Sequence, residues 1–331
     1  MADIANLAGV SMSTASRALA GHPRINLQTR ERIAELARSL QYSMHLGAQN
    51  LRLGQQPRPQ TVAVLLDAAQ QQPLRDPLLL ALIGSLADAL GAQGLQLQLC
   101  RTDAPPGTSL AELAQCGRAL GLLLLGEGLQ PTPLDEPAMP PLPRVAWGQP
   151  QAGWATVGFD ERAVGHLATA HLLAGGARRV LFLGQGDRSE TRLRLEGYHQ
   201  AHRQAGLVPD PALTQSLPLA GDAAGPAVRA LMAQNRDVDA VFASDDLLAI
   251  SLLGSLQAGP QRLGAARLAV VGCGDIAAAQ YAWPALSSVR LPMASAGPAL
   301  LQSLLSQRAG QAISATLLPP ELIVRDSSRG P

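Results

Sequence analysis

The chain contains no lysine, because all 26 of its basic residues are arginine. Every contact to a phosphate group must therefore come from arginine, a hydroxyl or a backbone N–H group. Cysteine is also scarce: Cys100, Cys116 and Cys273 lie far apart, and no two of them have the spacing of metal ligands. The sequence thus indicates neither a disulfide framework nor a zinc site, and it fits a reducing compartment.

Long apolar runs and catalytic motifs are absent as well. A run such as Leu120 to Leu125 is far too short to span a bilayer, and no apolar stretch of signal-peptide type precedes the basic N-terminal region. The sequence has no Gly-x-Ser-x-Gly elbow, no phosphate loop ending in Gly-Lys and no His-Glu-x-x-His motif. We expect a cytoplasmic protein with no membrane partner, no cofactor, no metal and no catalytic residue.

Charge is distributed unevenly along the 331 residues, although the formal net charge is only +1. Residues 1–58 hold seven Arg against Asp3, Glu31 and Glu35, which gives +4, so the remainder carries −3. With 47% hydrophobic residues, the whole chain can supply sizeable cores for more than one compact unit. A basic segment attached to a mildly acidic body is typical of a DNA-binding module joined to a different domain.

The segment AGVSMSTASRAL, Ala8 to Leu19, predicts the end of one helix, a tight turn and a second helix. Gly9 can adopt the positive φ of a sharp turn, Val10 can pack in the angle between the helices, and Ser11 can cap the second one. That helix should run from about Met12 to Leu19, with Ala15, Ala18 and Leu19 on its buried face.

The other face of this predicted helix carries Met12, Ser13, Ser16 and Arg17. A short polar face with one guanidinium suits the DNA major groove, where Arg binds guanine in bidentate fashion and discriminates bases by roughly 1–3 kcal/mol. From these residues alone, a small amphipathic helix packed on a larger domain is the alternative.

Beyond a linker at Gly54 to Pro59, apolar strand candidates alternate with helical stretches. The strand candidates are Thr61–Leu66, Leu95–Cys100, Leu122–Leu125, Arg144–Trp147, Val180–Leu183, Ala240–Ala243 and Leu268–Val271. The helical stretches include Leu78–Leu90, Ala163–Leu173, Leu193–Ala205, Ala223–Ala233 and Leu247–Leu256. This alternation predicts parallel sheets flanked by helices, and the number of units favours two similar α/β subdomains with a cleft between them.

With these motifs the chain resembles the LacI/GalR family of bacterial transcriptional regulators. The N-terminal likeness runs through Asp3-Ile4-Ala5, AGVS, STASRAL, TRERI (Thr29–Ile33) and LQY (Leu40–Tyr42). It continues in four segments of the body, Val157–Leu173, Thr191–Tyr198, Val241–Ser251 and Val270–Asp275. The chain departs from the family pattern at Ala20 for Asn, at Met44-His45 for Pro-Asn, and in having fewer residues before its first helix.

The resemblance implies a small all-α helix-turn-helix domain over residues 1–44, a hinge helix and linker over 45–59, and an effector-binding and dimerisation domain over 60–331. The last should have two doubly wound α/β lobes, as in periplasmic binding proteins of type I. We expect the first lobe to comprise about 60–157 and 286–313, and the second about 158–285 and 314–328. No heptad repeat follows the last strand, so a homodimer is expected rather than a tetramer.

The resemblance also assigns DNA contacts. Met12, Ser13 and Arg17 match positions that contact bases, and Ser11 and Thr14 match phosphate or capping positions. The other expected DNA-binding residues are Ser16, Arg24, Ala48 and Leu51. Ala48 and Leu51 match hinge residues that meet the minor groove, where an apolar wedge kinks the duplex. Ordinary packing between linker and body is the alternative for Leu51.

For the effector, polar residues directly after strand candidates are the ones to consider, because ligands bind at the carboxyl ends of parallel strands. The expected effector-binding residues are Asp76, Leu78, Trp147, Asp160, Arg194, Asp245 and Asp275. Leu78 and Leu79 stand where the family carries aromatic residues, and Glu161 stands where it usually carries Asn. Arg194 could instead pair with Glu190 or Glu196, Asp245 could cap a helix, and Trp147 could belong to the core.

Carboxylates accept hydrogen bonds from hydroxyls, and an indole ring can cover the C–H face of a pyranose, so this set resembles a neutral polyol site. The resemblance therefore implies a homodimeric regulator, a repressor of sugar uptake or catabolism, that a small sugar-like effector releases from a palindromic operator in double-stranded DNA. The alternative is a cytoplasmic sugar-binding protein or enzyme of the same architecture with a truncated, inactive DNA-binding domain.

Overall fold

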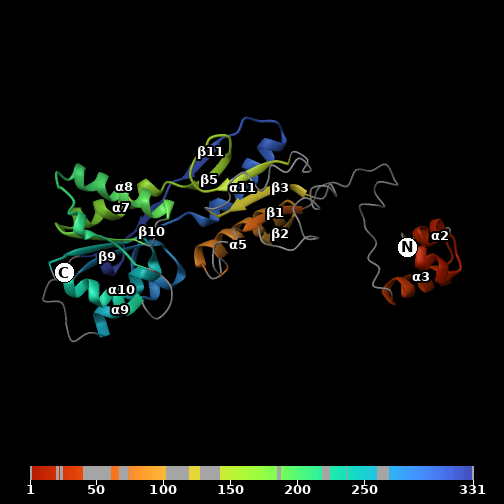
Figure 1. Cartoon of the computed structure of the whole chain (residues 1–331), viewed down its shortest axis with the longest axis horizontal. Helices are drawn as coiled ribbons and strands as arrows, with labels where there is room; N and C mark the ends of the chain where they lie inside the picture. The colour runs from red at the N-terminus through yellow and green to blue at the C-terminus, as the bar shows by residue number, and fades with distance from the viewer. Residues whose placement is uncertain are drawn as a thin grey trace. The chain divides into compact units, whose positions relative to one another are not determined.

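The computed structural model describes residues 2–19, 22, 25–39, 61–66, 74, 76–101, 119–126, 142–184, 188–217, 224–235, 237–258 and 268–329. It divides into two compact units, shown in Figure 1. The described residues up to Ser39 belong to the small unit, and those from Thr61 onward belong to the body. No helix in the described part of the chain is long and apolar enough to cross a membrane.

The small unit contains the helices α1 (Ala2–Ala8), α2 (Met12–Leu19) and α3 (Leu27–Ser39). The predicted turn is confirmed, because Gly9 has a φ of 63° and the backbone N–H of Thr14 donates to Ser11 Oγ over 3.1 Å. Asn26 caps α3 in the same manner, its Oδ1 accepting from the N–H of Thr29 at 2.7 Å. The sequence thus specifies these helix starts through local hydrogen bonds.

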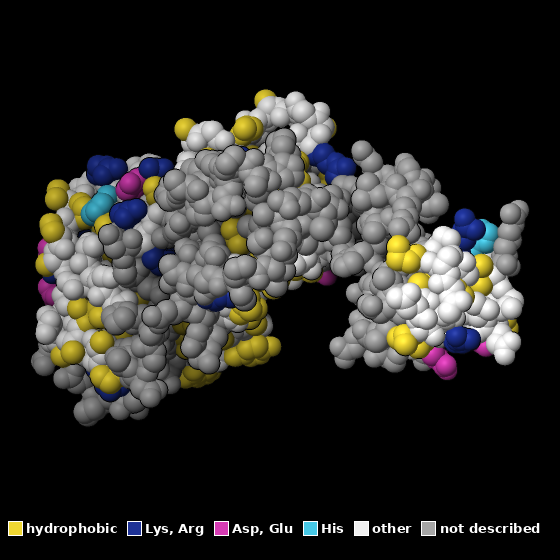
Figure 2. Space-filling view, turned by 45° about the vertical axis from the view of Figure 1, so that its right-hand side comes forward, with side chains coloured by type: hydrophobic (Ala, Val, Ile, Leu, Met, Phe, Trp, Pro, Cys, Tyr) yellow, Lys and Arg dark blue, Asp and Glu magenta, His cyan; other side chains and the backbone are white. Residues whose placement is uncertain are grey.

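The core of the small unit joins all three helices. Ile4, Ala8, Ala18 and Ile33 are buried together, and Val10 packs against them from the turn. This packing holds α2 by its alanine face and leaves its opposite face in solvent. Exposed apolar side chains such as Leu7, Met12 and Leu27 are scattered, in agreement with the isolated yellow patches on this unit in Figure 2.

The body contains two six-stranded sheets within its described residues. The first has the order β11-β5-β4-β3-β1-β2, and all its strand pairs are parallel. Its strands are β1 (Thr61–Leu66), β2 (Gln96–Arg101), β3 (Ala119–Leu125), β4 (Arg144–Trp147), β5 (Ala155–Phe159) and β11 (Ala315–Leu318). The helices α5 (Pro77–Ala92) and α11 (Met293–Arg308) pack against it and against each other. We call this sheet and its two helices the first lobe.

The second sheet has the order β12-β10-β9-β8-β6-β7, in which only the β10–β12 pair, within the described strands, is antiparallel. Its strands are β6 (Val180–Gly184), β7 (Thr214–Ser216), β8 (Ala240–Ala243), β9 (Ala269–Gly274), β10 (Ser287–Arg290) and β12 (Glu321–Ile323). Its helices are α7 (Glu161–Ala174), α8 (Ser189–Gln204), α9 (Ala224–Gln234) and α10 (Asp246–Ala258), with short 3₁₀ turns η2 (Pro211–Leu213), η4 (Ala277–Tyr281) and η5 (Asp326–Ser328). These elements form the second lobe.

The side chains of each strand alternate between the two faces of its sheet. In β6, Val180 and Phe182 join the core under α7 and α8, whereas Leu181 and Leu183 join the core under α9 and α10. A strand buried on both faces needs a continuous apolar sequence, which is how these strands could be predicted. The expected α/β fold with two doubly wound lobes is confirmed, and all seven strand candidates are present.

Two strands lie in the opposite lobe from the one that we expected. The expected boundary at 286–313 puts β10 in the first lobe, but it belongs to the second sheet. The expected boundary at 314–328 puts β11 in the second lobe, but it belongs to the first sheet. The chain crosses between the lobes later than predicted, at Leu291-Pro292 and at Pro319-Pro320. A proline has no N–H group to continue a strand ladder, so these prolines are natural ends for β10 and β11.

Glycines allow the helices α7 and α8 to approach closely. A Cβ atom on Gly165 would overlap the carbonyl oxygen of Arg194, and a Cβ on Gly197 would overlap that of Arg162. In the first lobe, a Cβ on Gly297 of α11 would overlap the backbone of Ser85 in α5. The close approach in the second lobe fixes the backbone of Arg194 against the start of α7.

Candidate functional site

A cavity of about 500 Å³ lies between the carboxyl ends of the two sheets. Its walls come from the ends of β3, β4, β5 and β8 and from the first turns of α5, α7 and α8. Carboxyl ends of parallel strands are the usual ligand sites of doubly wound sheets, because the chain leaves each strand there and opens a crevice. The volume is within the range of sites for small molecules.

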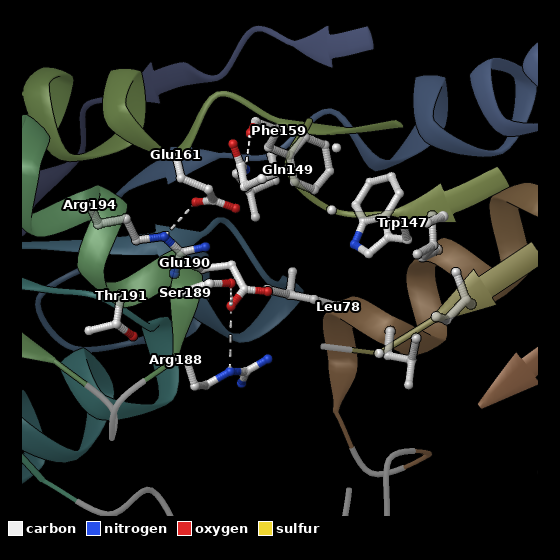
Figure 3. A pocket seen from close by; sticks show the side chains of 18 of the residues that line it. Leu78, Trp147, Gln149, Phe159, Glu161, Arg188, Ser189, Glu190, Thr191 and Arg194 are labelled. Carbon is white, nitrogen blue, oxygen red and sulfur yellow. Dashed lines mark hydrogen bonds and ion pairs between the residues drawn. The ribbon is translucent and has the colours of Figure 1, made fainter. Parts of the chain in front are cut away.

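The first lobe supplies an apolar wall. Leu78 and Leu79 come from the first turn of α5, and Trp147 and Phe159 come from the ends of β4 and β5. The two rings form an edge-to-face pair with centroids 4.9 Å apart, which Figure 3 shows on one side of the cavity. Gln149 lies beside them and donates from Nε2 to the carbonyl oxygen of Phe159 over 2.9 Å.

The second lobe supplies a polar wall whose central feature is an ion pair. Arg194 Nε donates to Glu161 Oε2 at 2.6 Å, and Arg194 Nη1 donates to the carbonyl oxygen of Ser244 at 2.5 Å (Figure 3). The side chains of Arg194 and Glu161 are 11% and 4% exposed. Burial raises the pKa of the Glu161 carboxyl, and the charge and hydrogen bond of Arg194 oppose that rise.

Two helix-capping carboxylates complete the cavity. Asp76 Oδ1 accepts from the N–H of Leu78 at 2.8 Å at the start of α5, and Asp245 Oδ1 accepts from the N–H of Leu247 at 2.7 Å at the start of α10. Burial raises the pKa of Asp245, two backbone N–H groups and Arg194 lower it, and the charge of Asp76 adds to the rise. The two carboxylates therefore interact although they belong to different lobes.

The structure thus brings Asp76, Leu78, Trp147, Arg194 and Asp245 together around one cavity. The two alternatives for Arg194 and Asp245 are both realised in part. Arg194 does pair with an acid, although that acid is Glu161, and Asp245 does cap a helix while it lines the cavity.

Asp160 and Asp275, which we expected to contact the effector, do not line this cavity. Asp160 caps α7, accepting from the N–H of Ala163 at 2.9 Å. Asp275 has a φ of 49° and pairs with Arg290 at 2.8 Å and with Arg325 at 2.7 Å. A polar residue after a strand can form hydrogen bonds or ion pairs with the next helix or a neighbouring strand, and these two do so.

Several lining residues were not predicted. Glu161, Gln149 and Glu190 all reach the cavity. For Glu161 a signal was present, since it stands next to the expected effector residue Asp160 and departs from the family's Asn. For Gln149 the signal was its place two residues after Trp147 at a strand end, whereas Glu190 gave none that separates it from a solvent-exposed helix residue.

Asp246, next to Asp245, is a buried structural residue. Its carboxyl accepts from Ser288 Oγ at 2.7 Å and from the N–H of Ile276 at 2.9 Å, which joins α10 to the ends of β9 and β10. Burial raises the pKa of Asp246 to about 6. Gly272 makes room for this carboxyl, because a Cβ there would overlap Asp246 Oδ1.

A second candidate site is the outer face of α2. Met12, Ser13 and Arg17 are exposed, and the hydroxyl of Ser11 lies 3.0 Å from that of Ser13 and 2.9 Å from that of Thr14. The face therefore offers hydroxyl groups beside one guanidinium. The side chain of Ser16 and the expected DNA-binding residues Arg24, Ala48 and Leu51 lie outside the described residues, as does the segment 45–59.

Comparison with known families places both sites in one protein type. Residues 1–44 match the model of bacterial regulatory proteins of the lacI family, and residues 169–328 match a periplasmic binding protein-like domain. The chain is also 30% identical to the HTH-type transcriptional regulator CelR of Thermobifida fusca, over 98% of this chain and 96% of the relative. The chain belongs to the LacI family of bacterial transcriptional regulators.

Other relatives of this LacI-family regulator agree with that membership. It is 26% identical to the HTH-type transcriptional repressor CytR of Escherichia coli over 99% of this chain and 96% of the relative. Among solved structures, a complex of the transcriptional regulator CelR with cellobiose is similar with a TM-score of 0.69 and 28% identity, covering 98% of both chains. A lac repressor dimer bound to operator has a TM-score of 0.71 at 20% identity over 98% of both chains, which shows a shared fold.

Proposed function

We propose that this LacI-family regulator is a homodimeric repressor that binds a palindromic operator and is released by a small neutral sugar. The observation that carries the proposal is the cavity between the lobes, with an apolar aromatic wall facing a wall of charged side chains. A sugar has the matching chemistry, because its C–H faces can lie on Trp147 and Phe159 while its hydroxyls donate to carboxylates.

On the DNA side, Met12, Ser13, Ser16 and Arg17 of α2 are proposed to contact bases. Ser11, Thr14 and Arg24 are proposed to contact phosphates, and Ala48 and Leu51 the minor groove. Two copies related by a two-fold axis would place two such helices on successive major grooves, so the operator should be palindromic. We further propose residues 1–44, 45–59 and 60–331 as DNA-binding, hinge and effector-binding parts, without enzymatic activity.

The proposed control follows from the position of the cavity. A ligand that contacts both Trp147 in the first lobe and Asp245 in the second binds best at one particular separation of the two lobes. It therefore favours one arrangement of the lobes over others, and only such a difference in affinity can shift the regulator between states. A coupling of about 1–3 kcal/mol between effector and operator is typical of such systems.

The test is a footprint of the full chain on DNA from its source genome at two salt concentrations, with and without cellobiose or ribose. We expect protection of a palindrome that weakens steeply with salt, because phosphate contacts release counterions, and that is lost when the effector is added. Arg17→Ala should abolish the preference for the palindrome, whereas Arg229→Ala, an exposed arginine of α9, should not change it. Unaltered sequence preference in Arg17→Ala would contradict the assignment of α2.

A further inference from the structure

The guanidinium of Arg194 faces the cavity with its charge already compensated. Glu161 Oε2 lies 2.6 Å from Arg194 Nε, and both side chains are almost fully buried, at 4% and 11% exposure. Glu161 comes from the first residue of α7 and Arg194 from the second turn of α8, and the glycine contacts between these helices hold the pair in place. The pair therefore presents no net charge to a ligand.

Arg194 is also poorly available for a second carboxylate. Bidentate binding of a carboxylate needs two neighbouring nitrogens of the guanidinium, which are either Nε with Nη2 or Nη1 with Nη2. Nε donates to Glu161, and Nη1 donates to the carbonyl oxygen of Ser244. One nitrogen of each such pair is thus engaged with the protein itself.

The other charged side chains of the cavity also disfavour a carboxylate ligand. Among the described lining residues, Asp76, Glu161, Glu190 and Asp245 stand against Arg188, Arg192 and Arg194. Arg188 lies 3.8 Å from Glu190 and faces it in Figure 3. A carboxylate brought into this part of the cavity would lose its hydration and would meet Asp245 and Asp76, so its entry is unfavourable.

We propose that Glu161 makes this cavity selective for neutral sugars over the corresponding sugar acids, by holding the charge of Arg194 for itself. The proposal rests on the proposed function, because it concerns the effector of the same site. Glu161 is a specificity-determining residue that acts through Arg194.

The experiment measures the binding of matched pairs of compounds to the full chain by calorimetry. Each pair is a neutral sugar and its aldonate: cellobiose with cellobionate, ribose with ribonate, and glucose with gluconate. For the wild-type chain we expect at least one neutral sugar to bind and its aldonate to bind at least about tenfold more weakly. In Glu161→Gln the ratio of the two affinities should shift toward the aldonate by about tenfold or more, because Arg194 is then uncompensated.

Two further variants distinguish the effect of the Glu161–Arg194 pair from the effect of the other negative charges in the cavity. Glu161→Asp keeps the charge and should keep the preference for the neutral sugar, and Glu190→Gln removes one negative charge elsewhere on the wall and should change the ratio much less. Equal shifts in Glu161→Gln and Glu190→Gln would overturn the role of Glu161.

The wild-type measurement alone can also overturn the proposal, even if Glu161→Gln does not fold. An aldonate that binds the wild-type chain as tightly as its neutral partner contradicts the selectivity and leaves a sugar-responsive regulator intact. Binding of neither member of any pair to the folded chain would overturn the sugar effector itself, and the selectivity with it.

Discussion

The two lobes of the body share one strand order but contribute opposite chemistry to the cavity between them. Ignoring the added strands β11 and β12, the order β5-β4-β3-β1-β2 of the first lobe repeats as β10-β9-β8-β6-β7 in the second. Yet, apart from Leu291 at the crossing between the lobes, the described lining residues of the second lobe are polar or charged, whereas Asp76 is the charged one among those of the first. A repeated backbone topology therefore sets where a ligand can bind, and the side chains at equivalent strand and helix ends decide how it is held.

The contrast is visible in the helices that open toward the cavity. α5 begins with Pro77 and three leucines, whereas α8 begins with Ser-Glu-Thr-Arg. Both helices follow the first strand of their sheet, and both point their first turn at the cavity. One wall can thus exclude water while the other supplies hydrogen bonds, which is the combination that an orienting pocket for a polyol needs.

The largest effect should come from breaking the buried ion pair of the polar wall. Arg194→Ala leaves Glu161 buried without its partner, which costs about 3–5 kcal/mol of unfolding free energy. The matched control is Arg162→Ala, since Arg162 pairs with Glu196 at the same 2.6 Å between the same two helices but is 57% exposed. Its loss should cost at most about 1 kcal/mol. Denaturant unfolding measures the loss of unfolding free energy in both variants. Equal losses would show that burial is not what distinguishes the two ion pairs.

A second effect should come from the buried acid of the second lobe. The pKa of Asp246 rises from 3.8 to about 6 on folding, so the folded state binds the proton more tightly and stability from this group falls as pH rises between these values. The ionised carboxyl of Asp246 therefore lowers the unfolding free energy by on the order of 3 kcal/mol, and this loss is constant above about pH 6. Unfolding free energies of the wild type minus those of Asp246→Asn should therefore decrease across this window. Parallel pH profiles of the two proteins would rule out titration of Asp246 there.

The smallest of these effects should come from the apolar wall. Trp147→Ala removes the ring that forms the edge-to-face pair with Phe159, and we expect the neutral sugar to bind about tenfold more weakly, with operator affinity unchanged. Trp147→Phe, which keeps an aromatic face, should recover most of that affinity in the same calorimetric titration. If both variants bind sugar like the wild type, the aromatic wall contributes packing rather than recognition.

Much of the fold could be predicted because its determinants are local. The turn at Gly9, the caps at Ser11 and Asn26 and the apolar runs of the buried strands depend on residues a few positions apart. α11 was missed because Pro298 interrupts its helical pattern, and β7 was missed because it has only three residues, which are polar. The sheet membership of β10 and β11 depended on where the chain crosses between lobes, which no local pattern indicates.

The candidate site was predictable only in part for a related reason. Strand ends pointed to Trp147 and Asp245, the family resemblance pointed to Asp76, and all three line the cavity. The same two signals also pointed to Asp275 and Asp160, which form an ion-pair cluster and cap a helix outside this cavity. A carboxylate after a strand has the same sequence signature whether it meets a ligand, a backbone N–H or an arginine, so only the packed structure separates these cases.

The sequence by itself determined that this chain has a basic helix-turn-helix segment, a body of two α/β lobes and the motifs of a LacI-family regulator, since helix caps, turn glycines and apolar periodicity act over a few residues. Only the tertiary structure decided which charges of the cavity neutralise each other. Glu161 and Arg194 are separated by 33 positions and meet because glycines let α7 and α8 approach closely. An ion pair between distant positions depends on helix packing, and no local pattern in the sequence records it.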